Sequence, residues 1–421
     1  MANQYRMKPE SPTICALPFG HLFLSEEGKN FPCCYALESG EPSRNERGEV
    51  IHASRNLEEV WNCADQKKIR LQMLAGEQPR ACTRCFVLEK HGLQSNREVS
   101  NLRFSGELAK AVSRVEKDGS MPLELYSLDL RLGNLCNLRC QMCSPVSSRL
   151  LARDFQLLYP DAGHGEKDPA LEWHRDPQLM GAFLSASDNL LEAHFAGGEP
   201  FLIPEVADFV RALSNRPSAK RMRLSFNTNA TVLPKKLLEL FPRFGGVRLV
   251  ISLDGMGRVN DYIRFPSRFD RVLENLKELH ERREEWNLGT VCFNVTVQVH
   301  NIFHLPELLR FLPREFPGFL PVPVLGPLNY PECLSVQVLP MAVKQEAADL
   351  LTAFCEEERL FWKSIESRDP NPHAATKFQN HVEGVVKFMM SEDRSNCLPE
   401  LRRFNEVIEK IRGQKLAVPG L

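Results

Sequence analysis

The segment Cys136-Asn-Leu-Arg-Cys140-Gln-Met-Cys143 places three thiols within eight residues, directly after an apolar run, Leu123–Leu132, that is typical of a β-strand. With 13 cysteines in 421 residues, the spacing C-x3-C-x2-C is expected by chance only about 0.01 times in such a chain. Three thiolates so spaced can surround one inorganic cluster, whereas a structural zinc site would need a fourth ligand from elsewhere. A site with three protein ligands keeps one position open, which is typical of a site that performs chemistry.

From about Leu123 onwards, short β-rich runs alternate with longer amphipathic ones. The expected strands are Leu123–Leu132, Glu192–Ala196, Met222–Asn227, Val247–Leu253, Val291–Val299 and Phe319–Leu325. Helical patterns include Ser147–Leu158, Pro204–Ser214, Pro234–Phe241, Phe269–Arg283 and Leu305–Leu312. This alternation predicts an α/β fold with a parallel sheet and crossover helices, although periodicity alone does not separate a partial barrel from a doubly wound sheet. Functional residues are then expected at the carboxyl ends of the strands, where the cysteine segment lies.

Charge and composition indicate a soluble protein that binds neither nucleic acid nor membranes. The formal net charge is −1, and no long run of one sign occurs. The first ten residues lack the apolar stretch of a secretory signal, and no stretch is apolar enough to span a membrane. The odd number of cysteines favours a reducing compartment, in which thiols serve as metal ligands or stay buried and free. We therefore expect a cytoplasmic protein.

On its three-cysteine segment, the chain resembles the radical S-adenosylmethionine (radical SAM) enzymes, whose signature is C-x3-C-φ-C. The resemblance implies a partial (β/α)6 TIM-type barrel in which Cys136, Cys140 and Cys143 hold a [4Fe–4S] cluster. It also implies that SAM binds the fourth iron and is cleaved reductively to a 5′-deoxyadenosyl radical, which abstracts hydrogen from a substrate. The φ position, usually aromatic, is Met142 here, a polarizable residue that can cover the same adenine face.

Further motifs resemble the SAM-binding elements of this family. Gly197-Gly198-Glu199-Pro200 follows the second barrel strand, as does the family element that meets the SAM amino group. Leu224–Ala230 resembles a T-N-G-type strand end, with Ala230 in place of the usual glycine. Val250–Gly255 is followed by Arg264, and together they resemble the S-L-D-G…I-R element of the peptide-modifying branch. In isolation these motifs read as a turn, a capped strand end and a surface arginine. The resemblance implies SAM contacts from Met142, Gly197, Gly198, Glu199, Asn229, Ser252 and Arg264.

A second cysteine set precedes the barrel. Gly28 lies between Cys15 and Cys33 and marks a hairpin turn that would bring the two together, while Cys82 and Cys85 form a C-x2-C chelate pair. Four thiolates in two pairs suit an all-cysteine zinc site or a fully ligated cluster. The spacing resembles the auxiliary-cluster domains called SPASM and twitch, and the order resembles radical SAM proteins with an N-terminal twitch domain. The implied auxiliary [4Fe–4S] ligands are Cys15, Cys33, Cys82 and Cys85, with Cys34 as the alternative for the second position.

These patterns predict three segments: an N-terminal twitch-like auxiliary iron–sulfur domain over 1–105, a small α+β unit; the radical SAM partial barrel over 120–330; and a helical C-terminal extension over 335–421. The other cysteines are expected to be packing residues or free thiols, namely Cys63, Cys292, Cys333, Cys355 and Cys397, and one tail thiol could donate a hydrogen atom to a substrate radical.

The predicted function is a radical SAM enzyme, of oxidoreductase or peptide-modifying type, that acts on a peptide or protein side chain. It would be served by the auxiliary cluster and by an external one-electron reductant of the flavodoxin or ferredoxin type. One alternative is an enzyme acting on a small molecule, with a structural zinc in the N-terminal domain. Another is a non-catalytic iron–sulfur or zinc sensor or scaffold.

Overall fold

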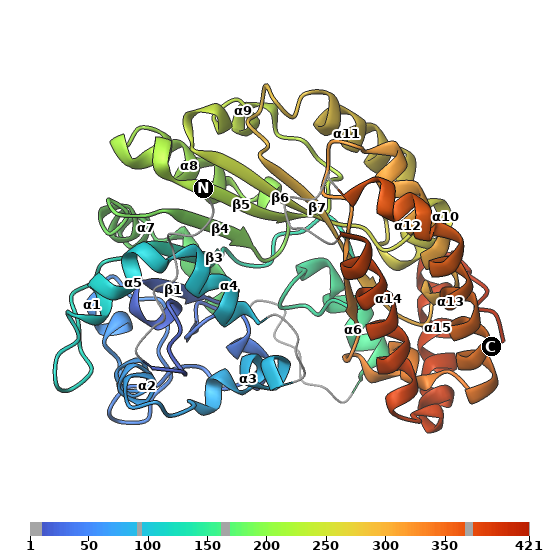
Figure 1. Cartoon of the computed structure of the whole chain (residues 1–421), viewed down its shortest axis with the longest axis horizontal. Coiled ribbons are helices and arrows are strands. Elements are labelled where there is room, and N and C mark those ends of the chain that lie inside the picture. Colours follow the sequence, from blue (N-terminus) through green and yellow to red (C-terminus); the bar gives the residue numbers. More distant parts are fainter. Residues whose placement is uncertain (1–10, 91–94, 161–168, 367–373, 421) are drawn as a thin grey trace. The chain divides into compact units, whose positions relative to one another are not determined.

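A computed structural model describes residues 11–90, 95–160, 169–366 and 374–420 of the chain (Figure 1). The chain divides into two compact units. Unit 1 comprises Met1–Asn134, Lys167–Ser225 and Arg243–Gly245, and unit 2 comprises Leu135–Glu166, Phe226–Pro242 and Gly246–Leu421. The predicted segment bounds at 1–105, 120–330 and 335–421 stay predictions.

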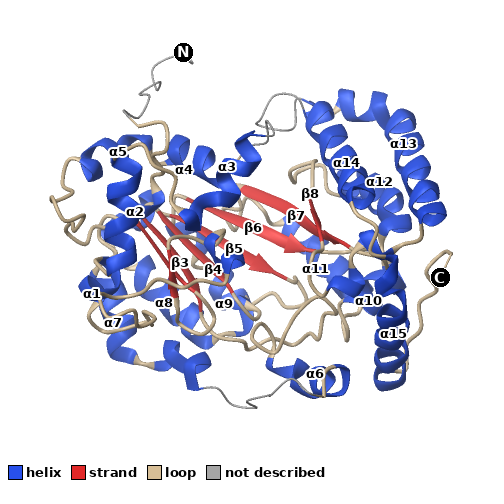
Figure 2. Cartoon of the chain, turned by 90° about the horizontal axis from the view of Figure 1, so that it is seen from below, coloured by secondary structure: helices blue, strands red, loops and turns tan. Residues whose placement is uncertain are grey.

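The strands form one open sheet in the order β2-β1-β3-β4-β5-β6-β7-β8, drawn in red in Figure 2. Their bounds are β1 His21–Leu24, β2 Asn30–Phe31, β3 Ser127–Arg131, β4 Glu192–Ala196, β5 Arg223–Thr228, β6 Gly246–Ser252, β7 Thr290–Val297 and β8 Val324–Pro327. Strands β1 and β2 pair antiparallel, whereas β1 with β3, β3 with β4, β6 with β7 and β7 with β8 pair in parallel. The mostly parallel sheet confirms the α/β class predicted from the alternation of strands and helices.

Two features of the sheet differ from the sequence-based expectation. The N-terminal hairpin extends the sheet, because His21 of β1 is in register with Ser127 of β3. The last strand begins at Val324 rather than at Phe319. Phe319 instead stacks on Phe316 with ring centroids 5.3 Å apart, and the prolines before Val324 cannot donate to a strand ladder.

The helices of unit 1 are α1 Leu57–Trp61, α2 Ala64–Leu74, α3 Thr83–Lys90, α4 Asn96–Arg103, α5 Ser105–Val112, α7 Pro177–Ser185 and α8 Pro204–Ser214. Helices α1 and α2 follow each other closely and are separated only by Asn62 and Cys63. The two helices are joined by Arg70, which is fully buried, stacks over the Trp61 ring at 4.4 Å and donates to the carbonyl oxygens of Trp61 and Pro18. This arginine ties α2 to the chain just after Cys15.

The helices of unit 2 are α6 Ala152–Leu158, α9 Lys235–Leu238, α10 Gly257–Ile263, α11 Phe269–Glu281, α12 Leu305–Glu315, α13 Met341–Ser364, α14 Ala374–Ser391 and α15 Leu398–Arg412. The last three confirm the helical C-terminal pattern. Helices α13 and α14 lie side by side, with the rings of Trp362 and Phe378 stacked 3.9 Å apart, and α15 packs against α6 (Figure 1). Across the described ranges, no helix is both long and apolar enough to cross a bilayer.

Candidate functional site

The cysteine loop of residues 136–143 lies in unit 2 and is fixed by backbone hydrogen bonds to the end of α10. The amide nitrogen of Arg139 donates to the carbonyl oxygen of Phe265 at 2.5 Å, and that of Gln141 donates to the carbonyl oxygen of Ile263 at 2.9 Å. The Gln141 side chain adds a hydrogen bond to the carbonyl oxygen of Tyr262 at 3.1 Å. These bonds hold the loop against the segment that carries Arg264.

Arg264 and Asp254 form a buried ion pair beside the loop. Arg264 Nε lies 2.7 Å from Asp254 Oδ2, and Arg264 Nη1 lies 3.9 Å from Cys140 Sγ. Burial raises the pKa of Asp254, although the guanidinium and the Thr296 amide, 2.7 Å from Oδ1, oppose that rise. Burial lowers the pKa of Arg264, but the Asp254 carboxylate and the ionised sulfur of Cys140 outweigh it and raise that pKa overall. A positive charge therefore stands next to the Cys140 sulfur.

The three loop thiols differ in their surroundings. A hydrogen bond with the Cys143 thiol lowers the pKa of Cys140, burial raises it, and Arg264 lowers it further, with a net decrease. The same hydrogen bond raises the pKa of Cys143. Cys136 Sγ faces the amide nitrogen of Leu138 at 3.4 Å. A lowered thiol pKa favours the thiolate, which is the form that binds metal.

Besides Arg264, three of the predicted SAM contacts lie in the same unit as the loop. Asn229 lies beside it, with Nδ2 3.1 Å from Asn137 Oδ1 and 4.0 Å from Cys136 Sγ. The next residue, Ala230, has a φ of 54°, a left-handed conformation that an alanine adopts at a cost of about 1 kcal/mol or more. This explains why the resembling family motif has glycine there. Ser252 ends β6 and is half-buried, as is Met142 in the loop.

Gly197, Gly198 and Glu199 belong to unit 1. Both glycines have positive φ, at 79° and 51°, and a Cβ on Gly197 would lie 2.9 Å from the Cβ of Arg131. Glu199 is 1% exposed, and its Oε1 accepts a hydrogen bond from the Phe201 amide at 3.2 Å. The carboxylate thus also caps the short turn that follows it, while its role toward SAM stays a prediction.

The second cysteine set lies in unit 1, where Cys15, Cys33, Cys82 and Cys85 line one cavity of about 20 Å3. The predicted turn at Gly28 is present, with a φ of 72° between the paired strands β1 and β2. Cys34 does not line this cavity. Burial, with a smaller contribution from Asp129 of β3, raises the pKa of Cys34 to about 12, and Arg131 of β3 opposes the rise. The geometry therefore groups Cys33, rather than Cys34, with the other three thiols.

Burial keeps these four thiols protonated in the metal-free chain. It raises the pKa of Cys82 to about 12 and also raises those of Cys15, Cys33 and Cys85. All thirteen cysteines lie within the described residues, and none forms a disulfide. Four thiols that line one cavity fit a metal centre, whose binding would displace their protons.

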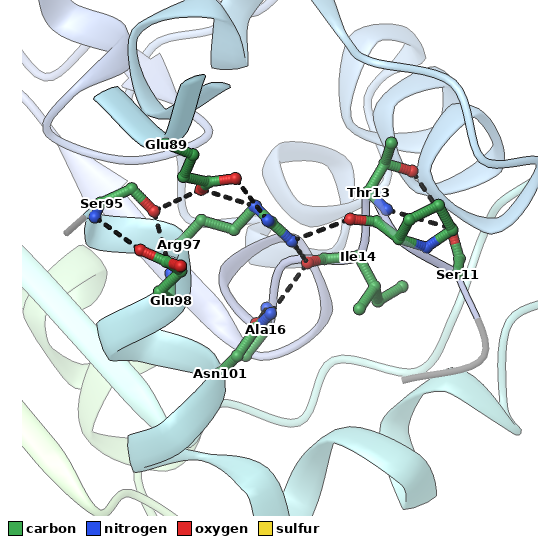
Figure 3. A network of polar contacts seen from close by, with 10 residues as sticks. Ser11, Thr13, Ile14, Ala16, Glu89, Ser95, Arg97, Glu98 and Asn101 are labelled. Atoms are coloured by element: carbon green, nitrogen blue, oxygen red, sulfur yellow. Dashed lines mark hydrogen bonds and ion pairs between the residues drawn. The ribbon is translucent and has the colours of Figure 1, made fainter. Parts of the chain in front are cut away.

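Arg97 and Asn101 together fix the backbone on both sides of Cys15, as Figure 3 shows. Arg97 Nη1 donates to the carbonyl oxygen of Ile14 at 2.8 Å, and its Nε and Nη2 form a two-point ion pair with Glu89 at 3.0 and 2.6 Å. Asn101 accepts from the Ala16 amide at 2.7 Å and donates to Ile14 at 2.9 Å. Arg97 also lowers the pKa of Cys15, against the larger effect of burial.

Sequence reasoning missed Arg97, which lies outside every recognised motif. It also missed a buried polar group on β3, where Asp129 is 4% exposed and Arg131 Nη1 lies 3.7 Å from Glu26 Oε1. A signal for that group existed, because Ser127-Leu-Asp-Leu-Arg131 alternates polar and apolar residues and so predicts one polar face.

Neither cysteine set has the geometry of single-ion coordination. Among the described residues, no group of three or more His, Cys, Asp or Glu side chains is placed to hold one metal ion. A cluster holds its ligand sulfurs farther apart than a single ion does. The candidate sites therefore rest on donor type, spacing and shared surroundings.

Comparison with known proteins identifies two domains in the chain. Residues 130–312 match the family model described as radical SAM superfamily, and residues 15–86 match the model described as an iron–sulfur cluster-binding domain, SPASM.

Curated relatives match parts of the chain. The tungsten-containing aldehyde ferredoxin oxidoreductase cofactor-modifying protein of Pyrococcus furiosus is 28% identical over 193 residues, which are 44% of this chain and 47% of the relative. A GTP 3′,8-cyclase of Acaryochloris marina is 30% identical over 160 residues, 38% of this chain and 40% of the relative. The chain thus spans about half the length of the curated relatives it matches, or less.

Two solved structures are similar at low sequence identity. Streptococcus suis SuiB bound to S-adenosylmethionine is 15% identical with a TM-score of 0.37, covering 83% of this chain and 69% of SuiB. The structure of anSMEcpe with bound AdoMet is 13% identical with a TM-score of 0.37, covering 63% of this chain and 67% of that chain.

Proposed function

We propose that this chain, which belongs to the radical SAM superfamily and carries an N-terminal SPASM iron–sulfur domain, is an enzyme that cleaves SAM reductively and abstracts hydrogen from a substrate. The observation that carries the proposal is the loop of Cys136, Cys140 and Cys143, fixed by backbone hydrogen bonds beside the charged guanidinium of Arg264. The family implies a [4Fe–4S] cluster and SAM at this loop and an auxiliary iron–sulfur cluster in the N-terminal domain. When bound and reduced, the loop cluster supplies the electron that cleaves SAM.

The loop residues fit such a cluster chemically. Cys136, Cys140 and Cys143 would each supply one thiolate, and Arg264 would stabilise the added negative charge through its position beside Cys140. Because Asp254 already occupies the Nε of Arg264, only the remaining donors of that guanidinium would be available to SAM. Asn229, next to Cys136, would orient the methionine end.

The N-terminal cysteines would hold the auxiliary cluster. Cys15, Cys33, Cys82 and Cys85 share one cavity and supply four thiols, which suits a fully ligated cluster. The match to an iron–sulfur domain favours this over the zinc alternative. This cluster would relay an electron or hold the substrate.

The test is anaerobic reconstitution followed by iron and sulfide analysis and by assay of 5′-deoxyadenosine after reduction with SAM present. We expect about eight irons per chain, corresponding to two four-iron clusters, and SAM cleavage. A Cys136→Ala, Cys140→Ala, Cys143→Ala triple variant should retain about four irons and lose all cleavage. A wild-type protein that loads the loop and cleaves no SAM would contradict the proposed function.

The proposed substrate class is a peptide or protein side chain, because the Ser252–Gly255 and Arg264 element resembles the peptide-modifying branch. The test is whether fractions of a cell extract stimulate 5′-deoxyadenosine formation by the reconstituted enzyme. Loss of the stimulation after protease digestion of the fraction would support a peptide, whereas stimulation that survives digestion would indicate a small molecule. The reductant is proposed to be a flavodoxin or ferredoxin, tested by replacing the chemical reductant with each purified protein.

A further inference from the structure

Helix α15, at the C-terminal end of the described chain, delivers a buried arginine to the cysteine loop. The side chain of Arg412 is only 1% exposed, and its Nη2 donates to Asp154 Oδ2 at 3.0 Å. Asp154, with a fully buried side chain, lies on α6 and accepts a second guanidinium, because Arg139 Nη1 lies 2.8 Å from its Oδ1. Arg139 is part of the loop itself, directly before Cys140. One carboxylate therefore links the loop to a helix more than 250 residues later in the chain.

The two arginines also share an aromatic partner. The guanidinium carbons of Arg139 and Arg412 lie 4.8 and 5.3 Å from the centroid of the Phe265 ring. The Phe265 carbonyl oxygen is the acceptor of the Arg139 amide, so backbone, ring and carboxylate contacts converge on this one turn of the loop. Such a convergence fixes the orientation of Arg139 and therefore of the adjacent Cys140.

The charges of this group do not cancel. One carboxylate faces two guanidiniums, which leaves one positive charge in excess inside the protein. Two further donors of Arg412, Nε and Nη1, are buried and have no hydrogen-bond partner among the described residues. Arg412 and Cys143 line the same small cavity, so this guanidinium lies close to one of the proposed cluster ligands. Because Asp154 also faces Arg139, the buried guanidinium of Arg412, which lines one cavity with Cys143, is not fully compensated and favours a negative group there.

We propose that Arg412 is a positioning residue of the radical SAM cluster site, which orients the loop through Asp154 and stabilises the negative charge of the reduced, thiolate-bound cluster. The proposal rests on the proposed function of the Cys136–Cys143 loop and assigns a role to the C-terminal helices, which none of the recognised motifs covers. It requires that removal of the positive charge makes reduction of this cluster harder, since the reduced form carries one more negative charge.

The test is a redox titration of the anaerobically reconstituted full chain, followed by electron paramagnetic resonance without SAM. Electrons come from dithionite through mediators, and each cluster takes up one. The auxiliary cluster serves as the internal reference, and the triple cysteine variant identifies its signal. Arg412→Met should lower the reduction equilibrium constant of the loop cluster about tenfold, which is about 59 mV for one electron. Lys410→Met, which removes an exposed charge from the same helix, should leave it unchanged.

Two further variants separate charge from mere structure. Arg412→Lys keeps the positive charge, so the reduction potential of its loop cluster should stay close to that of the wild type. Asp154→Asn removes a negative charge and should shift the potential upward, opposite to Arg412→Met, whereas a general loosening of the loop would move both in the same direction. If Arg412→Met does not fold, Arg412→Lys and Asp154→Asn still show whether the reduction potential follows the charge.

The outcomes distinguish this inference from the proposed function. Suppose that the wild-type loop cluster loads and cleaves SAM, but that its reduction equilibrium constant changes less than twofold in Arg412→Met, or changes equally in Lys410→Met. That result overturns the role of Arg412 alone. Shifts of the same sign in Arg412→Met and Asp154→Asn also overturn it. Absence of any cluster at the loop of the wild-type protein overturns both.

Discussion

Replacing Arg97 with methionine is expected to loosen the segment that carries Cys15. Arg97 and Glu89 are 13% and 18% exposed, and three guanidinium nitrogens hold Glu89 and the carbonyl oxygen of Ile14. Methionine keeps an aliphatic stem over Phe86, so the main loss is the charge-assisted hydrogen bonding.

The magnitude lies between two limits. An exposed ion pair contributes about 0–1 kcal/mol, and breaking a fully buried one costs about 3–5 kcal/mol. The pair here is mostly buried, but Glu89 keeps its hydrogen bond from Ser95 and the Ile14 carbonyl keeps that from Asn101. We therefore expect a loss of about 2–3 kcal/mol in the local opening free energy, or roughly 30- to 150-fold faster hydrogen exchange.

The assay is hydrogen–deuterium exchange mass spectrometry of the metal-free, reduced protein, read on peptides covering residues 11–24. The matched control is Arg80→Met, because Arg80 forms an ion pair with Glu41 but is 87% exposed. In Arg80→Met, the exchange rate of these peptides should stay within a few-fold of the wild-type rate. Exchange in Arg97→Met within threefold of wild type, with the fold intact, would refute the reasoning.

The difference in hydrogen-exchange rate between Arg97→Met and wild type should also depend on pH. Hydrogen bonding to Arg97 and Ser95 lowers the pKa of Glu89, against the effect of burial. A lowered carboxyl pKa contributes stability above its unfolded value of 4.5, and this contribution is lost as the pH falls through the lower folded value. The difference in local opening free energy between wild type and Arg97→Met should therefore become smaller in acid. A difference that stays constant down to low pH would show that Glu89 is not involved.

Three other outcomes can be measured on the same protein. Cys33→Ala should lose about four irons per chain while Cys34→Ala keeps them, because only Cys33 lines the cavity with the other thiols; equal loss in both would contradict this assignment. Asp254→Asn should lower stability by about 3–5 kcal/mol, since it leaves a buried guanidinium uncompensated, and an unchanged unfolding midpoint in urea would exclude that. Burial lowers the pKa of His300 to about 4, so its contribution to stability is complete above pH 6.5 and is lost as the pH falls toward 4. His300→Gln should then flatten the pH dependence of urea unfolding between pH 7 and 5, and a slope equal to that of wild type would contradict it.

Local patterns predicted most of the elements. Glu192–Ala196 and Pro204–Ser214 have the bounds expected from sequence, because each combines a clear periodicity with turn or proline signals at its ends. Phe319–Leu325 was misplaced, since an apolar run predicts a strand whether its residues enter a ladder or, as Phe319 does, pack against Phe293. Tertiary packing decided between these two states, and no single-sequence pattern reports it.

The candidate ligands were predictable for a different reason. Thiol spacing is a local property, so Cys136, Cys140 and Cys143 were recognisable without the fold. The choice between Cys33 and Cys34 was not, because adjacent residues differ by the face they present, and the sequence does not fix which face meets Cys82. The structure places Cys33 at one cavity with Cys15, Cys82 and Cys85, which favours Cys33 as the proposed ligand.

The charged residues around the loop could not be identified from sequence motifs. The residues that set its electrostatics are Asp254, Arg264, Asp154 and Arg412, and three of these lie more than 100 residues after Cys140. Metal ligands determine which group binds, whereas hydrogen bonds, net charge and burial set its potential. Two chains with the same C-x3-C-x2-C segment can therefore differ in how readily the bound cluster is reduced. In this chain α15 belongs to the same compact unit as the loop and carries one of the two cations acting on Cys140. On this argument, the C-terminal extension helps to set the charge around the proposed cluster site.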